Sequence, residues 1–361
     1  MKRFLSCVVT ILLILSMVPA FAEEITISGK VAEIEKYGHA LLDISIEDFN
    51  ASGFALGDIV TVTAGSFTDN MPYLNGYYVD QGEYMVRAYP GHTNIAVCIN
   101  YGKFSEETGI DVGDQVTITR KEKAGALALQ EINNLVYTNE RTDYASDAEF
   151  ANFRAVVEGK LYRSASPVDN QYNRAAFANA LIQEAGVQAV MNMASTEEDI
   201  KACFNGQDFN SFYYKDLYEA GKVIALGLPI NFTSDEFGEG IVKGLTFLAE
   251  QNPPYLVHCT EGKDRAGFCS MILEALMGRS KDEIVADYML SYTNYYGIEA
   301  GTEKYDMIVE KNIKEMLRSV AGLETGASLD GVDLQFAAEA YLTRHGMAEE
   351  TIKALEAKIL P

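Results

Sequence analysis

The sequence predicts an α/β protein in which a small all-β barrel precedes a mostly parallel sheet flanked by helices. Three observations support this architecture. The first third of the chain alternates apolar and polar residues with period two between Gly and Asn turns, which is typical of antiparallel strands. The rest alternates short buried runs with helical stretches, which is typical of a parallel sheet covered on both faces. The length of 361 residues leaves room for about two or three domains.

An export leader opens the chain. Lys2 and Arg3 precede an apolar run over residues 4–18, and an Ala-Phe-Ala triplet ends at Ala22. A charged start, a short apolar run and an A-x-A site are typical of a signal peptide, and the run is too short to span about 30 Å of hydrocarbon. We expect cleavage after Ala22 (segment 1–22) and a bacterial protein that is secreted or on the cell surface, with no stable membrane span. An uncleaved N-terminal anchor is the alternative.

The composition excludes several classes of partner. The net charge is −23, and loss of the leader's two basic residues makes it −25. Phosphate backbones repel such a surface, so we expect no nucleic-acid partner and no binding to anionic membranes. Five cysteines without a CxxC pair and four scattered histidines predict neither a disulfide scaffold nor a metal site. No cofactor is expected.

Residues 23–132 form the predicted β-barrel module. Its β-rich runs begin at Ile25, Asp58, Tyr84 and Gln115. A weak repeat joins its halves, because Gly-His at 38–39 precedes Leu-Gly-Asp at 56–58, and Gly-His at 91–92 precedes Val-Gly-Asp at 112–114. The Gly-Asp pairs predict tight turns that enter strands, and two such units could close into one small barrel.

Segment 82–114 of this module resembles the C-terminal β-barrel of the SAM hydroxide adenosyltransferase family. The larger N-terminal half of that family is missing here, so the resemblance implies a fold and no activity. His39 and His92 have two interpretations: a binding site between the repeated units, or polar residues beside a repeated turn. The sequence places no second kind of ligating residue near either, and the module's ligand stays unknown.

A polar segment, 133–155, predicts a linker, and residues 156–361 then form the α/β domain. Helices are expected over 172–185, with Gly186 at the C-terminal end, and over 235–250, with Ser234 as N-cap. From Arg265 onward the chain is predicted to be helical, with a capping box at 280–283. The short buried strands are expected over 159–165, 187–193, 223–228 and 255–258.

The segment from Tyr255 to Phe268 carries the chemistry. A buried strand ends at His258, a helix begins near Asp264 or Arg265, and Cys259-x5-Arg265 spans the junction. Amides of a tight loop that enters a helix form an anion cradle, and the helix dipole adds about half a positive charge. Arg265 can bind two phosphate oxygens with its guanidinium fork, and the same field favours the Cys259 thiolate.

The other loop residues complete this predicted cradle. Thr260, Glu261, Gly262, Lys263 and Ala266 are expected to bind phosphate. Gly262 lets the backbone bend without a Cβ, and the lysine supplies local positive charge. The acidic side chain at 261 is expected to point to solvent.

His-Cys-x-x-Gly-Lys-Asp-Arg-x-Gly over 258–267 resembles the active-site loop of the cysteine-dependent protein tyrosine phosphatase superfamily, in its secreted bacterial tyrosine and phosphoinositide phosphatase branch. The segments 159–164, 187–192 and 282–288 also resemble that domain, so the likeness covers roughly 155–300. It implies a phosphocysteine mechanism in which Cys259 is the nucleophile and Arg265 holds the phosphate. Asp264 would be the general acid, while Asp208 and Asp216 are alternative acids. The rival interpretation is that Asp264 only pairs with Arg265 or caps the helix.

Two residues refine this expectation. His258 is expected to orient the loop and to tune the thiolate rather than act as a base, since it ends a buried strand. The family usually has Ser or Thr after the loop arginine, and Ala266 stands there, which puts fast hydrolysis of the intermediate in doubt. Cys203 or Cys269 could act as a resolving thiol, although inert core cysteines are the plainer interpretation.

The expected function is therefore a secreted protein tyrosine phosphatase, with dual-specificity or phosphoinositide-directed activity as variants. Its substrate would be a phosphotyrosine protein or a phosphoinositide. One alternative is an inositol-phosphate (phytase-like) phosphatase, which would need a more basic pocket. A second alternative is a phosphate-binding pseudo-phosphatase with slow turnover.

Overall fold

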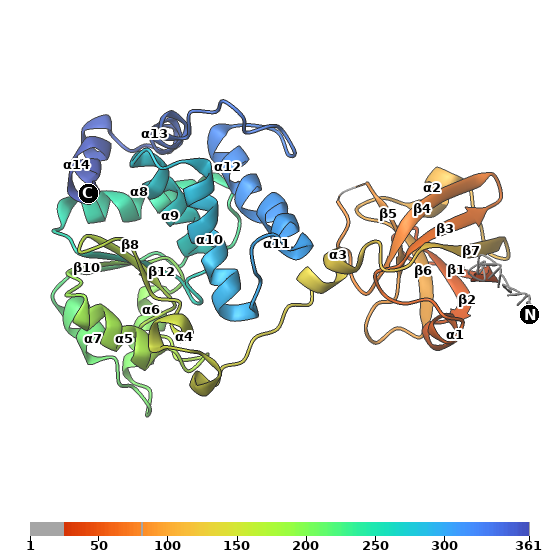
Figure 1. Cartoon of the computed structure of the whole chain (residues 1–361), viewed down its shortest axis with the longest axis horizontal. Coiled ribbons are helices and arrows are strands. Elements are labelled where there is room, and N and C mark those ends of the chain that lie inside the picture. Colours follow the sequence, from red (N-terminus) through yellow and green to blue (C-terminus); the bar gives the residue numbers. More distant parts are fainter. Residues whose placement is uncertain (1–24, 81, 361) are drawn as a thin grey trace, which may run out of the picture. The chain divides into compact units, whose positions relative to one another are not determined.

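The computed structural model describes residues 25–80 and 82–360, and the chain divides into two compact units, Met1–Gln130 and Glu131–Pro361 (Figure 1). The expected leader lies outside the described residues. Within the described ranges, no helix has both the length and the apolar character needed to cross a membrane.

In the described part of the first unit, seven strands close into a barrel in the order β1-β2-β6-β5-β4-β3-β7. The predicted barrel is thus confirmed. Its wall pairs are antiparallel except for β4 with β5. The elements are β1 (Thr26–Ile34), β2 (Ala40–Ser45), α1 (Ile46–Ala51), β3 (Ile59–Ala64), β4 (Phe67–Leu74), β5 (Tyr84–Arg87), β6 (Asn94–Ile99), α2 (Phe104–Thr108) and β7 (Gln115–Glu122), with α3 (Leu127–Ile132) across the boundary between units.

The sequence repeat in the barrel is a repeated turn. Gly57 and Gly113 have φ angles of 91° and 92°, in the left-handed region that glycine occupies without strain. The side chains of Asp58 and Asp114 each accept a hydrogen bond from the amide three residues earlier, at 3.0 and 2.8 Å. The two turns lead into β3 and β7, which pair with each other.

The second unit contains a mixed sheet in the order β11-β10-β12-β9-β8. All neighbours are parallel except β8 with β9, so the predicted mostly parallel sheet is confirmed. The described elements are η1 (Arg141–Asp143), α4 (Asp147–Phe150), β8 (Arg154–Val157), β9 (Leu161–Ser164), α5 (Ala175–Glu184), β10 (Ala189–Asn192), α6 (Glu197–Phe204), α7 (Phe212–Glu219), β11 (Val223–Ala225), α8 (Asp235–Glu250), β12 (Tyr255–His258), α9 (Asp264–Leu276), α10 (Lys281–Tyr296), α11 (Glu303–Ile308), the π-helical turn η2 (Val309–Ile313), α12 (Lys314–Ala321), α13 (Leu334–Arg344) and α14 (Glu349–Ile359).

Helices cover both faces of this sheet (Figure 1). Helices α5, α6 and α7 pack on one face around Tyr214 and Leu256, while α8, α9, α10 and the C-terminal helices pack on the other around Val257 and Phe268. Strand β12 lies between β10 and β9, and each of its residues is buried. Because both faces of the sheet are covered, the strand appears in the sequence as a continuous apolar run.

The segment expected to be a linker, 133–155, belongs to the second unit. It contains η1, α4 and the first half of β8, and Phe150 is buried with Tyr144 and Tyr295. Its polar residues hid this from the sequence pattern, because most of them are exposed and only a few, such as Asn152 and Arg154, bond buried groups.

Candidate active site

The loop between β12 and α9 forms the candidate site. Register places His258 beside Ser164 of β9 and Asn192 of β10, so the loop starts at the carboxyl edge of the sheet. Gly262 has a φ of 70°, and a Cβ there would lie 2.3 Å from the carbonyl carbon of Ser164. Glycine is therefore needed at this position both for its φ and for the close approach of the two backbones.

The carbonyls of the loop face outward and are hydrogen-bonded. The Ser166 amide donates to the Thr260 carbonyl at 3.0 Å. The Glu261 carbonyl accepts from the Tyr295 hydroxyl at 2.6 Å and from the Asn152 side-chain amide at 3.2 Å.

One side chain bonds the next two carbonyls. The guanidinium of Arg163 donates to the carbonyls of Gly262 and Lys263 at 2.8 and 3.0 Å. Among the described residues, no acceptor bonds the amides of 260–263. These amides are therefore available to a bound anion on the inner side of the loop.

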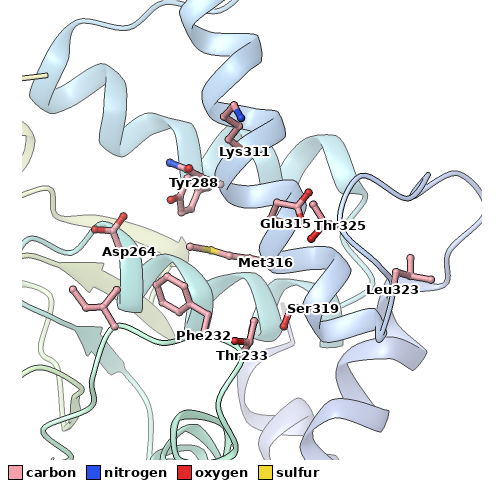
Figure 2. Close-up of a pocket in the computed structure, with 12 residues that line it drawn as sticks. Phe232, Thr233, Asp264, Tyr288, Lys311, Glu315, Met316, Ser319, Leu323 and Thr325 are labelled. Carbon is pink, nitrogen blue, oxygen red and sulfur yellow. The ribbon is translucent and has the colours of Figure 1, made fainter. Parts of the chain in front are cut away.

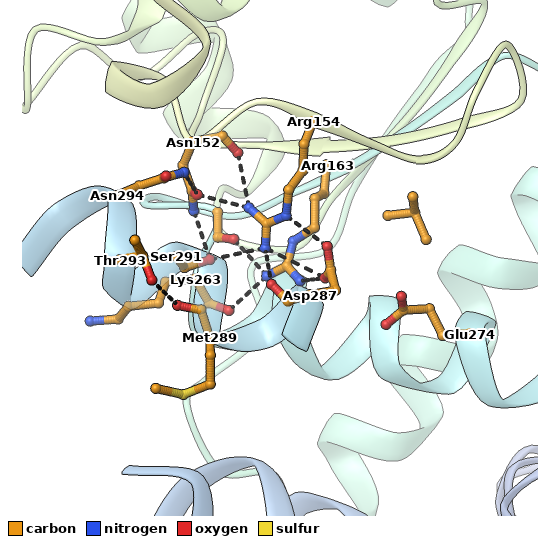
Figure 3. A network of polar contacts seen from close by, with 12 residues as sticks. Asn152, Arg154, Arg163, Lys263, Glu274, Asp287, Met289, Ser291, Thr293 and Asn294 are labelled. Carbon is orange, nitrogen blue, oxygen red and sulfur yellow. Dashed lines mark hydrogen bonds and ion pairs between the residues drawn. The ribbon is translucent and has the colours of Figure 1, made fainter. Parts of the chain in front are cut away.

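A buried network of charged and polar side chains supports the loop (Figure 3). Asp287 of α10 pairs with Arg163, which is fully buried, and with Arg154 at 2.7 Å. Asn152 accepts a hydrogen bond from Arg154 at 2.8 Å and donates to Ser291 at 3.0 Å. Burial alone would raise the pKa of Asp287, but the two guanidinium groups hold it well below its usual range.

Cys259 and Arg265 lie at the two ends of this loop. The Cys259 side chain is buried, with 3% of the residue exposed. The Arg265 guanidinium donates to the Leu228 carbonyl at 2.8 Å and to the Thr260 hydroxyl at 3.1 Å. These contacts orient the guanidinium.

Lys263 and Glu261 form a second, polar cluster. Lys263 Nζ lies 3.7 Å from Glu261 and 3.8 Å from Asp264, and it donates to the Tyr296 hydroxyl at 3.0 Å. Glu261 also accepts a hydrogen bond from Tyr137. The expectation that the Glu261 side chain points to solvent is wrong, because these two partners hold it. Burial opposes the charge on Lys263, but the Asp264 and Glu261 carboxylates raise its pKa.

Asp264 is the first residue of α9, and it lines a pocket of about 580 Å³ (Figure 2), whereas Cys259 and Arg265 are not among the described residues that line it. Apolar side chains form much of the wall, among them Phe232 and Met316. Burial raises the pKa of Asp264 above its ordinary value, although Lys263 and Arg265 oppose this. About 29% of the side chain stays exposed. A carboxyl group in such surroundings holds its proton to a higher pH than a solvated aspartate.

His258 is buried on the face of the sheet that α5 to α7 cover. Its ring packs edge-on to Tyr214 at 5.9 Å, and Nδ1 lies 3.3 Å from the Cys259 carbonyl oxygen. Burial lowers its pKa to about 3, so the imidazole is neutral. Ala266 is also buried, with its methyl group in the core of the domain, so only its backbone can face an anion.

Several supporting residues escaped the sequence analysis. Asn152 and Arg154 lie in the expected linker, where an asparagine and an arginine beside an apolar run were the only signal. Arg163 and Asp287 lie in segments noted for family likeness, without a role. The alternative acids Asp208 and Asp216 are exposed, on the α6–α7 loop and on α7.

The remaining thiols are poor partners for Cys259. Burial raises the pKa of Cys269 to about 12, and it also raises the pKa of Cys203. Cys269 packs 3.9 Å from the Met191 sulfur in the core. This favours inert core cysteines over a resolving thiol. Within residues 25–80 and 82–360, no three His, Cys, Asp or Glu side chains are grouped to hold a metal ion.

The sequence profile of the tyrosine phosphatase family matches residues 145–361, which is more than half of the chain. The chain belongs to this family. The match begins before β8, so Asn152 and Arg154 are part of the tyrosine phosphatase domain.

Individual known proteins resemble the chain less closely than the family profile does. A Cupriavidus necator protein, provisionally named as a tyrosine-protein phosphatase, is 29% identical over 163 residues, which cover 39% of this chain and 56% of that protein. The chain thus spans little more than half of this relative. Two solved structures are weak likenesses. The catalytic domain of the S. cerevisiae PP-IP phosphatase SIW14 is 18% identical, and the match covers 47% of this chain and 91% of that chain with a TM-score of 0.28. P. aeruginosa TpbA is 20% identical, and the match covers 52% of this chain and 95% of that chain with a TM-score of 0.28. The likeness of the barrel to the adenosyltransferase module stays a prediction.

Proposed function

We propose that this protein is a secreted phosphomonoester hydrolase that removes phosphate from tyrosine through a phosphocysteine intermediate. The observation that supports the proposal is the loop itself, whose carbonyls are bonded to other side chains, which leaves its amides for an anion between Cys259 and Arg265. Family membership supports the reaction class. Export rests on the leader at residues 1–22.

The reaction has two steps. The Cys259 sulfur attacks phosphorus, an S–P bond forms, and the P–O bond to the leaving group breaks. Loop amides and Arg265 stabilise the charge on the equatorial oxygens. Asp264 gives its proton to the leaving oxygen. A water molecule then attacks phosphorus and gives a proton back to Asp264, a P–O bond forms and the S–P bond breaks, so that inorganic phosphate leaves and the thiolate is restored.

The pocket beside Asp264 favours an aromatic leaving group. Ile230, Phe232 and Met316 offer apolar contacts to a tyrosine ring whose oxygen lies near the carboxyl. The charge of Lys263 is balanced by Glu261 at 3.7 Å, so little positive charge remains for further phosphates. We therefore favour phosphotyrosine over phosphoinositides and inositol phosphates.

The second step should be the slower one. Ala266 has no hydroxyl to stabilise the departing thiolate, and its side chain lies in the core. A burst of product, about equal to the enzyme concentration, should precede a slow steady state. A linear time course in the native protein would contradict this account of Ala266.

The decisive experiment compares substrates and variants. The native protein, Cys259→Ser and Asp264→Asn are assayed on p-nitrophenyl phosphate, a phosphotyrosine peptide, a phosphoinositide panel and inositol hexakisphosphate. We expect Cys259→Ser to lose at least roughly 10³-fold in rate, and the peptide to be the best natural-type substrate. Activity retained in Cys259→Ser would refute the mechanism, and preference for inositol hexakisphosphate would refute the substrate class.

The acid is tested by its pH dependence. Because Asp264 acts in its protonated form, activity should fall as pH rises through its raised pKa. Asp264→Asn should lose about 10²-fold or more and lack this alkaline limb. The matched control is Asp216→Asn, which removes the exposed alternative acid and should leave the profile intact. The reverse result would move the acid to Asp216.

A further inference from the structure

A polar cavity lies on the outer face of the barrel. Val86 and Val97 point into the barrel interior, so Arg87, the next residue after Val86, points outward. Arg87 is buried at 4% exposure and borders a cavity of about 400 Å³. His39 and His92, which the sequence repeat singled out, border the same cavity. The second kind of ligating residue that the sequence lacked is thus supplied by a different strand.

Among the described residues, the Arg87 guanidinium is bonded only to side chains that also line this cavity. It donates to Glu35 at 3.0 Å and to the Tyr77 hydroxyl at 2.8 Å, and it lies 3.4 Å from His92 Nδ1. The Glu35 carboxylate balances the guanidinium charge. The cavity wall therefore carries donors and acceptors but little net charge.

Two buried polar atoms on this wall have no partner in the described residues. They are His39 Nδ1 and Arg87 Nε. An unpartnered buried polar atom costs roughly 1–3 kcal/mol, so folded proteins seldom leave one without a function or a bound group. Both atoms are shielded from solvent, so a polar ligand in the cavity would bond them only if a neighbouring side chain moved aside.

Tyrosine rings surround the opening. Tyr37, Tyr77 and Tyr89 are 64%, 37% and 42% exposed, and Tyr77 and Tyr89 lie 6.3 Å apart. A second cavity, of about 630 Å³, shares the lining residues Lys36, Tyr37, His39 and Tyr77 with the first. The two cavities adjoin along this shared wall and together have room for more than one ring.

We propose that this face of the barrel is a binding site for a neutral oligosaccharide. Sugar hydroxyls both donate and accept, which suits a wall of paired Arg87 and Glu35 with an unpartnered His39 nitrogen. The C–H face of a sugar ring packs well on an exposed tyrosine ring. The two adjoining cavities favour linked rings over a single one.

Other ligand classes fit less well. A phosphate or carboxylate would meet a guanidinium that Glu35 already neutralises, on a chain of net charge −23. A single planar base could stack on tyrosine but would fill one cavity only. The sugar site is independent of the phosphatase site, because every residue in it belongs to the barrel unit.

Calorimetric titration of the whole protein tests this proposal. The probes are neutral tetrasaccharides with cello-, xylo-, malto- and chito-type backbones, with adenosine and inorganic phosphate as the other classes. At least one tetrasaccharide should bind with a Kd of about 1 mM or tighter. No binding of any tetrasaccharide at about 10 mM, or tighter binding of adenosine or phosphate, would overturn the proposal.

Variants locate the site. Tyr89→Ala removes an exposed ring, and His39→Gln removes the unpartnered imidazole, and each should weaken binding about tenfold or more. Val112→Ala, on an exposed turn of the same barrel, is the matched control and should bind normally. Cys259→Ser should also bind normally. Undiminished binding by Tyr89→Ala, which has no core contact to lose, would place the sugar elsewhere and refute the site.

Discussion

Arg163 in the phosphatase unit and Arg87 in the barrel are both almost fully buried, and each pairs with a carboxylate. Their other bonds differ. Arg163 donates to two backbone carbonyls of the loop between β12 and α9, whereas the Arg87 guanidinium bonds side chains at a cavity wall. A guanidinium bonded to backbone carbonyls sets the shape of a loop. One bonded to side chains beside open space adds polar groups to a binding surface.

The partners of the two arginines follow the same division. Asp287 is 11% exposed and bonds two arginines, so removing its charge would leave two buried cations without compensation. Glu35 is 21% exposed and bonds one arginine that has other partners. Loss of the paired carboxylate should therefore affect the phosphatase loop more than the barrel. The predictions below test this, from the largest effect to the smallest.

Asp287→Asn should destabilise the phosphatase unit by about 3–5 kcal/mol, because Arg154 and Arg163 lose a buried counter-charge. Activity should fall as well, since Arg163 positions the carbonyls of the loop. Urea denaturation and phosphatase assay measure the two effects. Asp282→Asn, at an exposed site on the same helix, is the control. Equal stability of the two variants would contradict the structural role of the network.

Gly262→Ala should cost about 2–4 kcal/mol and abolish phosphate binding, because the new Cβ would meet the Ser164 backbone at 2.3 Å. Gly186→Ala is a matched control with a φ of 63° and open space around the Cβ. It carries the backbone cost alone, about 1–2 kcal/mol. Protection of the Cys259 thiol against iodoacetamide by added phosphate measures whether the loop still binds phosphate. Normal protection in Gly262→Ala would show that the close approach is not required.

Stability should fall on acidification because of His258. Its folded pKa is about 3, and an unfolded histidine titrates near 6.5, so between these values only the unfolded chain binds the proton. The free energy of unfolding should drop by up to about 1.4 kcal/mol for each pH unit below 6.5. Urea titrations at pH 7.5, 6.5 and 5.5 measure this slope. His258→Gln should flatten it, and an unchanged slope would assign the protons to other groups.

Glu35→Gln should have the smallest effect, a loss of about 1 kcal/mol in the barrel with unchanged phosphatase activity. The amide can still accept from Arg87, and the guanidinium keeps its bond to Tyr77. Thermal unfolding followed by circular dichroism measures the loss. A loss of stability as large as that of Asp287→Asn would show that the two arginines do not differ in this way.

The periodicity of apolar residues predicted much of the fold, because apolar residues recur at the positions that are buried. Helix α8 has the predicted bounds 235–250 with Ser234 as cap, β12 spans the predicted 255–258, and the capping box at 280–283 is present. The chain boundary between units was harder to place. Most polar residues of 133–155 are exposed, as in a linker, but Asn152 and Arg154 bond buried partners, and a sequence pattern does not distinguish the two cases.

The sequence by itself determined the loop between β12 and α9, since Cys259, Gly262 and Arg265 lie within one short segment whose local geometry follows from a strand, a turn and a helix. Only the tertiary structure decided what holds that loop, because Asn152, Arg163 and Asp287 lie outside it in the sequence, before β8, in β9 and in α10. The same is true of the barrel cavity. His39 and His92 were visible as a repeat, but Arg87 and Glu35 reach them only through strand pairing, which no local pattern records.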